Sequence, residues 1–387
     1  RKCVETAGKE DNLMSTDASL DTREPLELLC DLDERELIKL ERLLEIRRVR
    51  LQFALEHHVN THNERMDFVH YPHIRALYNS TSAEIVLQGS VQSQKSEFAI
   101  IDMLASAHVG MSIFFCVPKF ETRTTYVQNR IDRCVENVPE YKKIIGNGFF
   151  DSVAIKSFGK GVIKFVGSNV IADFTEFPAD MIYVEEVDQC HQKNIGYALD
   201  RLRASRYQFK RYLGNPTERG KGINELFQKS DQREWEVPCL SCGEYTAVDW
   251  FTCVVEEIVD KEGNVLDYKL RDNEWVKGCR RDIKLICPSC GGVLDRASAL
   301  GKWIPREPLN KAEGYHISML CSMINTVSDM WQRFMEAQHD PGKLQRFFNS
   351  DLGLPYAEAG NRVTETLLDL CSDPEYDFEI KKDCAHI

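Results

Sequence analysis

The stretch from residue 84 to 97 constrains the fold of this chain more than any other. It is an apolar strand that ends at Gly89, a short polar loop, and a helix that begins after Lys95. A phosphate-binding loop has the pattern G-x-x-x-x-G-K-[ST], in which backbone N–H groups and the helix N-terminus hold phosphate oxygens. Gly89, Lys95 and Ser96 match it, whereas Gln94 stands where the second glycine is expected. The stretch therefore predicts a nucleotide site with one departure.

If the backbone at Gln94 is left-handed, a non-glycine residue there costs roughly 1 to 3 kcal/mol of strain, which ligand binding can offset. We expect Lys95 to neutralise terminal phosphates and Ser96 to reach magnesium. Such an imperfect match is by itself more often coincidence than site, so its support must come from motifs further along the chain. The predicted nucleotide-binding residues are Gly89, Ser90, Val91, Gln92, Ser93, Gln94, Lys95, Ser96 and Glu97.

Composition indicates an ordinary globular protein with more than one subdomain. The chain has 387 residues, of which 43% are hydrophobic, and single cores stop growing near about 250 to 300 residues. It contains no long apolar run and no signal-peptide pattern, which favours a cytosolic protein without a membrane span. Its 14 cysteines are then thiols or metal ligands. A formal charge of -12 argues against a uniformly basic nucleic-acid binder, although a local basic track is compatible with DNA.

Strand and helix patterns alternate from about residue 68 to 225. This alternation predicts an α/β domain with a largely parallel sheet, which is what a phosphate-binding loop requires around it. The expected strands are 84–88, 112–117, 162–166, 181–184 and 210–213, and the expected helices are 95–108 and 119–137.

An amphipathic helix is expected before this domain, over residues 31–58. Its apolar stripe would consist of Leu37, Leu40, Leu44, Arg47 and Leu51. Packing on its own domain is the more common role of such a helix, and docking of a partner subunit is the alternative. Complete burial of the helix within its own domain would exclude the second role.

The strand 181–184 ends in two acidic residues, Glu185 and Glu186. Hydrolysis of a nucleoside triphosphate needs one carboxylate at such a strand end to hold magnesium and another to orient and deprotonate water. We assign Glu185 to magnesium and Glu186 to the general base, with Asp188 as the next candidate base. The usual first acid is aspartate, so Glu185 is a second departure. An exposed acidic turn after a buried strand is an equally frequent explanation of the pair.

A polar turn follows the strand 210–213, at Gly214, Asn215, Pro216 and Thr217. Such a turn can sense the terminal phosphate and couple hydrolysis to movement, although Gly-Asn-Pro by itself is usually only a turn.

Basic residues gather between the acidic pair and this turn. Arg201, Arg203 and Arg206 are candidates for an arginine finger, which speeds phosphoryl transfer about a thousandfold or more. The same residues can simply solvate a helix. The sequence does not choose among the three, and we take Arg203 as the candidate.

Two Cys-x-x-Cys-Gly motifs, at Cys239 and Cys242 and at Cys287 and Cys290, predict a structural zinc site with four thiolate ligands. Four thiolates leave no open position for water, so a catalytic zinc is not expected. The long separation between the pairs requires an intervening hairpin, which residues 261–264 are suited to form.

With these features in this order, the chain resembles the large terminase subunit of tailed bacteriophages, of the phage lambda type. The matching stretches cover residues 65 to 360: Gln94–Glu97, Phe165–Asn169, Val184–Asp188, Gly214–Thr217, the cysteine motifs, Phe348–Asn349 and Leu352–Pro355. That family packages double-stranded DNA into a procapsid by ATP hydrolysis and cuts DNA with a C-terminal nuclease domain.

The resemblance implies roles for individual residues. Lys95 would contact the β- and γ-phosphates of ATP, Ser96 and Glu185 would bind Mg2+, and Glu186 would be the catalytic base. Residues 214–217 would form the coupling turn. Tyr71, with Pro72, would lie near the adenine. Double-stranded DNA, a small terminase subunit and the procapsid portal are the implied partners. A homo-oligomeric ring in the host cytoplasm is implied, and a monomer in isolation is left open.

The expected fold is a P-loop (RecA-like) α/β core with a zinc-ribbon-like insertion and a helical N-terminal segment. We expect no endonuclease activity, because the nuclease domain would begin near the end of this chain. Two alternatives are a hydrolysis-impaired module that binds DNA or portal, and a helicase-like translocase, for which a second ATPase lobe is missing. The expected parts are an acidic arm (1–30), the helical segment (31–64), the core (65–235), the insertion (236–305), a lid or linker (306–360) and a linker (361–387).

Overall fold

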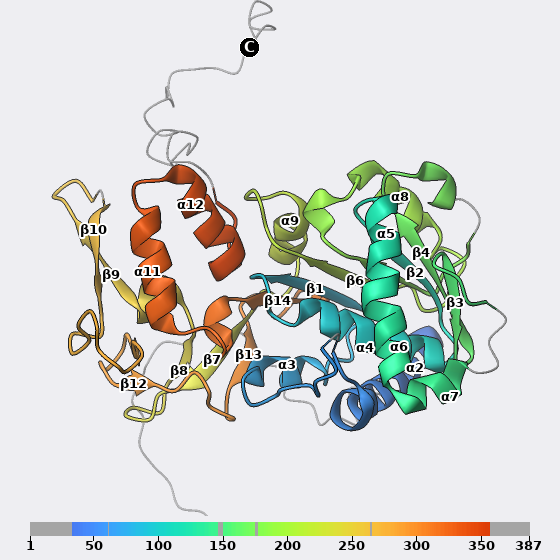
Figure 1. The fold of residues 1–387 in the computed structure, drawn as a ribbon, viewed down its shortest axis with the longest axis horizontal. Helices are drawn as coiled ribbons and strands as arrows, with labels where there is room; N and C mark the ends of the chain where they lie inside the picture. The colour runs from blue at the N-terminus through green and yellow to red at the C-terminus, as the bar shows by residue number, and fades with distance from the viewer. Residues whose placement is uncertain (1–32, 61, 146–149, 175–176, 264, 357–387) are drawn as a thin grey trace, which may run out of the picture.

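A long, mostly parallel sheet forms the centre of the molecule (Figure 1). The computed structural model describes residues 33–356 except 61, 146–149, 175–176 and 264, so the predicted arm 1–30 and linker 361–387 lie outside the described residues. Within the described part the sheet has ten strands in the order β13-β7-β14-β1-β6-β5-β2-β4-β3, with β8 paired to β7. In that part, no helix has the length and apolar character needed to cross a bilayer.

The five predicted strands are confirmed and lie together in this sheet. They are β1 (Glu84–Gly89), β2 (Ser112–Val117), β4 (Gly161–Gly167), β5 (Met181–Val184) and β6 (Phe209–Gly214), and all pair in parallel. Their order places β6 between β1 and β5. Because parallel strands end at the same edge of a sheet, the phosphate loop, the acidic pair and the polar turn all emerge there.

Helices cover both faces of the sheet, as a parallel sheet requires. On β2, Phe115 packs in the cluster with α2 (Glu34–Gln52) and α4 (Lys95–His108), whereas Phe114 packs with α8 (Gln192–Asp200) and α9 (Gly222–Gln228) on the opposite face. Both rings are fully buried. The predicted helix 95–108 is confirmed. The predicted helix 119–137 is a helical run of three parts, α5 (Phe120–Tyr126), η2 (Val127–Asp132) and α6 (Arg133–Asn137), followed by α7 (Pro139–Ile145).

Strands distant in sequence complete the sheet, and sequence analysis did not predict them. β14 (Glu313–Ile317) pairs in parallel with β1, and β7 (Arg233–Pro238) and β13 (Lys302–Pro305) lie beyond it. The stretch expected as an insertion therefore begins and ends within strands of the central sheet. β3 (Ile155–Phe158) is added antiparallel at the other edge.

The part between β7 and β13 packs with the C-terminal helices as a second core. Trp250 is buried against Phe334 and Phe347, with ring centroids 5.4 and 5.2 Å apart. The elements between β7 and β13 are β8 (Tyr245–Ala247), α10 (Trp250–Cys253), β9 (Val255–Val259), β10 (Val265–Leu270), β11 (Leu285–Ile286) and β12 (Val293–Leu294). The C-terminal elements are η5 (Met319–Cys321), α11 (Val327–Ala337), α12 (Pro341–Arg346) and η6 (Phe347–Leu352).

The N-terminal helix is present as α2 and η1 (Phe53–His57), but the predicted buried stripe is wrong. Leu37 and Leu44 are 38% and 45% exposed, and the buried face consists of Leu43, Ile46, Val49, Arg50 and Phe53. The reason is that this helix carries two apolar sets at helical spacing, and only packing against α4 and the pairing of Arg50 decide which of them is buried. The helix is therefore only partly buried in its own domain.

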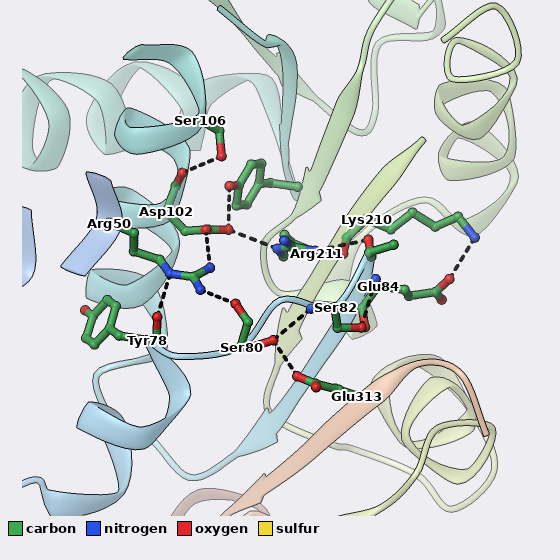
Figure 2. A network of polar contacts seen from close by, with 12 residues as sticks. Arg50, Tyr78, Ser80, Ser82, Glu84, Asp102, Ser106, Lys210, Arg211 and Glu313 are labelled. Carbon is green, nitrogen blue, oxygen red and sulfur yellow. Dashed lines mark hydrogen bonds and ion pairs between the residues drawn. The ribbon is translucent and has the colours of Figure 1, made fainter. Parts of the chain in front are cut away.

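A buried carboxylate explains the position of Arg50 (Figure 2). Asp102 of α4 accepts from Arg50 Nη1 at 2.7 Å through Oδ1, and from Arg211 Nε at 2.9 Å through Oδ2. Tyr183 donates its hydroxyl to the same Oδ2 at 2.8 Å. Burial alone would raise the pKa of Asp102, but Arg211 and Arg50 outweigh it and hold that pKa below its usual value. One side chain thus joins α2, α4, β5 and β6.

We expect Asp102→Asn to lower the free energy of unfolding by about 3 to 5 kcal/mol, because removing one partner leaves buried arginine charge uncompensated. Glu225→Gln is the matched control, since its ion pair with Lys229 is exposed and should contribute less than about 1 kcal/mol. Urea unfolding followed by circular dichroism measures both. Equal losses in the two variants would contradict the role of Asp102.

Candidate functional site

A cavity of about 830 Å³ lies where β1 ends and α4 begins. All of the predicted loop residues from Val91 to Glu97 line it, whereas Gly89 and Ser90 lie behind it at the end of the strand. Glu186 and Asn215 line it as well, so residues from three predicted motifs come together. The size of the cavity is within the range of ordinary ligand sites.

Gln94 has the left-handed backbone that the phosphate-loop pattern anticipates. Its φ and ψ are 64° and 12°, and Gln92 has φ 52°. The first departure therefore leaves the path of the loop as a glycine would set it. A non-glycine residue in this conformation adds backbone strain of roughly 1 to 3 kcal/mol. Gln94 is also the residue directly before α4.

The ammonium group of Lys95 turns back onto its own loop. Nζ donates to the carbonyl oxygens of Gly89 and Ser90, at 3.1 and 2.5 Å, and to Oγ of Ser93 at 3.1 Å. It also reaches Oδ1 of Asn215 at 3.3 Å. Burial lowers the pKa of Lys95 to about 8, although Glu186 and Glu185 oppose the shift. A phosphate group would supply the negative charge that these neutral acceptors lack.

Ser96 and Glu185 are in direct contact. The Ser96 hydroxyl donates to Oε1 of Glu185 at 2.5 Å, and burial raises the pKa of that carboxyl against the effect of this bond. Its other oxygen, Oε2, is buried without a hydrogen-bond partner among the described residues. A hydroxyl beside an unpaired buried carboxylate oxygen is a donor set that suits Mg2+. The longer side chain of Glu185 therefore still reaches the predicted site.

Glu186 and Asp188 have different surroundings. Glu186 begins η4 (Val187–Gln189) with φ 53° and lines the cavity. Asp188 accepts from the N–H and hydroxyl of Thr217 and from the N–H of Ile223, at 2.6 to 2.8 Å. Both oxygens of Asp188 are thus engaged, which argues against its use as the alternative base. Of these two acids, Glu186 is therefore the one that lines the cavity.

The arginines that line the cavity are not those predicted as the arginine finger. Arg203 is 81% exposed, pairs with Asp200 at 2.8 Å, and is not among the lining residues. Arg130 of η2 lines the cavity instead and contributes to the electrostatics of Glu185, and the more exposed Arg133 lines it too. Sequence reasoning missed Arg130 because one arginine in a charged helix has no distinguishing pattern. The only indication in the sequence is that this helix follows β2, whose C-terminal end lies at the sheet edge where the phosphate loop emerges.

Another part of the cavity wall is formed by Ile324 and by residues that precede Pro72, namely Asn60, His62, Glu64, Arg65, Met66, Asp67 and Tyr71. Tyr71, predicted near the adenine, is part of this wall, and Pro72 is the first residue of α3 (Pro72–Leu77). An aromatic ring about the size of a base provides a stacking surface.

The predicted coupling turn connects to two regions. Asn215 faces the cavity, and Thr217 contacts Asp188 through its N–H and hydroxyl. The carbonyl oxygen of Thr217 accepts from Asn349 Nδ2 and from the N–H of Tyr356, both at 3.3 Å.

The four predicted cysteine ligands converge in a separate site. The sulfur atoms of Cys239, Cys242, Cys287 and Cys290 all lie within 4.8 Å of one another. The two knuckles are alike, since Gly243 and Gly291 have φ 78° and 74° and donate to the carbonyls of Cys239 and Cys287. The N–H groups of Cys242 and Ser241 lower the pKa of Cys239 to about 6, which favours a thiolate. This group could hold a metal ion, and four thiolates suit zinc.

Family models match two parts of this chain. That of the phage terminase large subunit gpA ATPase domain matches residues 65–303, and that of the terminase large subunit gpA endonuclease domain matches residues 312–376. A search of curated proteins gave no match.

Solved structures of large terminases are similar to this chain at low identity. The ATPase domain of the Thermus phage P74-26 large terminase aligns over 76% of this chain and 96% of its own, with 10% identity and a TM-score of 0.44. The large terminase from another thermophilic bacteriophage aligns over 46% of this chain and 39% of its own, with 10% identity and a TM-score of 0.30.

The endonuclease match corrects one expectation. The nuclease domain was expected to begin near the end of this chain, but its family model begins at residue 312. The expected lack of endonuclease activity therefore has no support from these boundaries. The described part of the match contains β14 at the centre of the sheet, together with α11, α12 and η6.

We expect the purified chain to contain about one zinc ion, and Cys287→Ser to lose most of it, because three thiolates hold the ion less well than four. Cys279→Ser is the matched control, since Cys279 lies outside the cluster. Elemental analysis by mass spectrometry measures the content. A zinc-free wild-type protein, or equal loss from the two variants, would contradict the assignment.

Proposed function

The chain belongs to the family of phage terminase large subunits, as its sequence resemblance predicted, and we propose that it hydrolyses ATP to move double-stranded DNA into a procapsid. The observation that carries the proposal is that Lys95, Glu186 and Asn215 line a single cavity, with the Ser96–Glu185 pair at its base. The phosphate loop, the acidic pair and the coupling turn are thereby within reach of one triphosphate.

Lys95 is the residue that changes partners when ATP binds. Its ammonium group would leave the carbonyls of Gly89 and Ser90 and Oδ1 of Asn215 for β- and γ-phosphate oxygens. Asn215, freed from Lys95, can then turn its amide toward the terminal phosphate. Mg2+ held by Ser96 and Glu185 would neutralise charge on the phosphates.

Glu186 would take the proton from the attacking water. It is part of the cavity wall and only half-buried, so a water molecule in the cavity can reach its carboxylate. Arg130, on the same wall, would stabilise negative charge that develops on the phosphoryl group. Within one chain, Arg130 therefore replaces Arg203 as the candidate arginine finger.

The partners follow from the proposed motor. The motor would translocate double-stranded DNA and would dock on the portal of the procapsid. It would act in the host cytoplasm as a ring of identical chains. The exposed Leu37 and Leu44 on α2 leave that helix available for a small terminase subunit. The cysteine cluster would hold zinc as a structural ion that ties the two knuckles together.

We expect Glu186→Gln to reduce ATP turnover by a factor of about 100 to 10,000, because an amide cannot accept the proton of water. Nucleotide binding should persist, since the loop and Lys95 are unchanged. Phosphate release with and without double-stranded DNA, together with nucleotide titration, measures both properties.

Wild-type binding without turnover, in either condition, would favour the second candidate, a hydrolysis-impaired module that binds DNA or portal. The strained Gln94 and the glutamate at position 185 are the observations that favour this candidate. Equal turnover in wild type and Glu186→Gln would instead remove Glu186 as the base.

Arg130→Ala should lower kcat for ATP by about a thousandfold if its charge acts on the transferred phosphoryl group. Arg203→Ala should keep most of its activity in the isolated chain, because Arg203 pairs with Asp200 outside the cavity. Steady-state kinetics of both variants, with thermal unfolding as the fold control, rank the two arginines. The opposite ranking would restore Arg203 as the finger.

A further inference from the structure

Asp188 lies two residues after the proposed base, yet its carboxylate is held by donors of the following loop and is not part of the cavity wall. Oδ2 accepts from the N–H of Thr217 at 2.8 Å and from its hydroxyl at 2.6 Å. Oδ1 accepts from the N–H of Ile223 at 2.6 Å, in the first turn of α9. The carboxylate therefore joins η4, which begins at Glu186, to both ends of the loop 217–223.

The loop is built around this carboxylate. Gly222 has φ 54°, and a Cβ at that position would lie 2.2 Å from Oδ1 of Asp188. A side chain there would have to displace the carboxylate as well as strain the backbone. Hydrogen bonds from three donors to one ionised group are stronger than neutral ones and fix its orientation.

Thr217 continues the connection on its other side. Its carbonyl oxygen accepts from Asn349 Nδ2 and from the N–H of Tyr356. The same C-terminal segment contacts the phosphate loop directly, because the N–H of Val91 donates to the carbonyl of Ser350 at 2.9 Å. It also contacts β1 just before the loop, where Gln88 Nε2 donates to the carbonyl of Gly353 at 3.1 Å. The segment 347–356 thus contacts both the coupling turn and the phosphate loop.

Resting on the proposed ATPase function, we propose that Asp188 is a positioning residue that links Glu186 to the segment 347–356 through Thr217. Asp188 holds the loop that carries Glu186 against the coupling turn, so the base and Asn215 keep a fixed relative position. Movement of the turn on nucleotide binding then passes through the carbonyl of Thr217 to Asn349 and Tyr356. This segment lies within the part of the chain that matches the terminase endonuclease domain.

Asp188→Asn tests the link while preserving side-chain size. The NH2 group of the asparagine would face a hydrogen-bond donor of Thr217 or Ile223, so the hydrogen bonding to one of these two residues is lost. We expect kcat for ATP to fall by about tenfold, the equivalent of one lost hydrogen bond to a charged group, while the Kd for a non-hydrolysable ATP analogue stays within about twofold. In the wild-type chain the analogue should change hydrogen exchange of residues 347–356, and in the variant that change should disappear.

Two further variants keep the test decisive. Thr217→Val removes only the hydroxyl donor and should give a smaller effect in the same direction, which covers the case in which Asp188→Asn fails to fold. Asp329→Asn is the matched control, because Asp329 is also an aspartate in a first helical turn but lies outside the cavity wall. It should leave both the exchange response and kcat unchanged.

The outcomes separate this inference from the proposed function. Failure of the wild-type chain to bind the analogue would overturn the proposed function itself. Analogue binding without an exchange response in wild type, or an unchanged response in Asp188→Asn, would overturn the link alone. A parallel loss of analogue affinity and kcat would show that Asp188 only maintains the site.

Discussion

The carboxylate of Asp102 is the interaction on which the arrangement of the nucleotide site depends. It lies seven residues after Lys95, on the helix that follows the phosphate loop. Its partners are Tyr183, two residues before Glu185, and Arg211, three residues before Gly214. A single buried charge cluster therefore fixes the helix of the phosphate loop relative to the strands that end in the acidic pair and in the coupling turn. Because an unpaired charge in this interior is unfavourable, any change in their relative position is strongly opposed.

This rigid base contrasts with the open sheet edge above it. There, residues at or next to the ends of the same three elements are hydrogen-bonded to one another: Lys95 to Asn215, Ser96 to Glu185, and Thr217 to Asp188. Three of the residues at this edge, Gln92, Gln94 and Glu186, have left-handed backbone without being glycine. Strained residues of this kind persist where the surrounding structure holds them, and they are concentrated at functional sites.

Much of the fold was predictable, because its signals lie in contiguous residues. β5 begins and ends at the predicted residues 181 and 184, and α4 at 95 and 108. The stripe on the first helix was mispredicted, since two apolar sets run along this helix and contacts with distant residues, such as the pairing of Arg50 with Asp102 fifty-two residues later, select the buried one. β14 was missed for a related reason. Its five residues carry no distinctive pattern, and their place beside β1 depends on a chain connection of more than two hundred residues.

The candidate site divides in the same way. Sequence by itself located the loop 89–97, the acidic pair 185–186, the turn 214–217 and the cysteine knuckles, because in each case the predicted chemistry needs neighbouring residues at a fixed spacing. Only the tertiary structure decided that Arg130 rather than Arg203 faces the cavity, that Asp188 binds Thr217 and Ile223, and that residues 347–356 contact the phosphate loop. These are pairings between distant segments, and they are set by strand order and packing, to which no local pattern in the sequence corresponds.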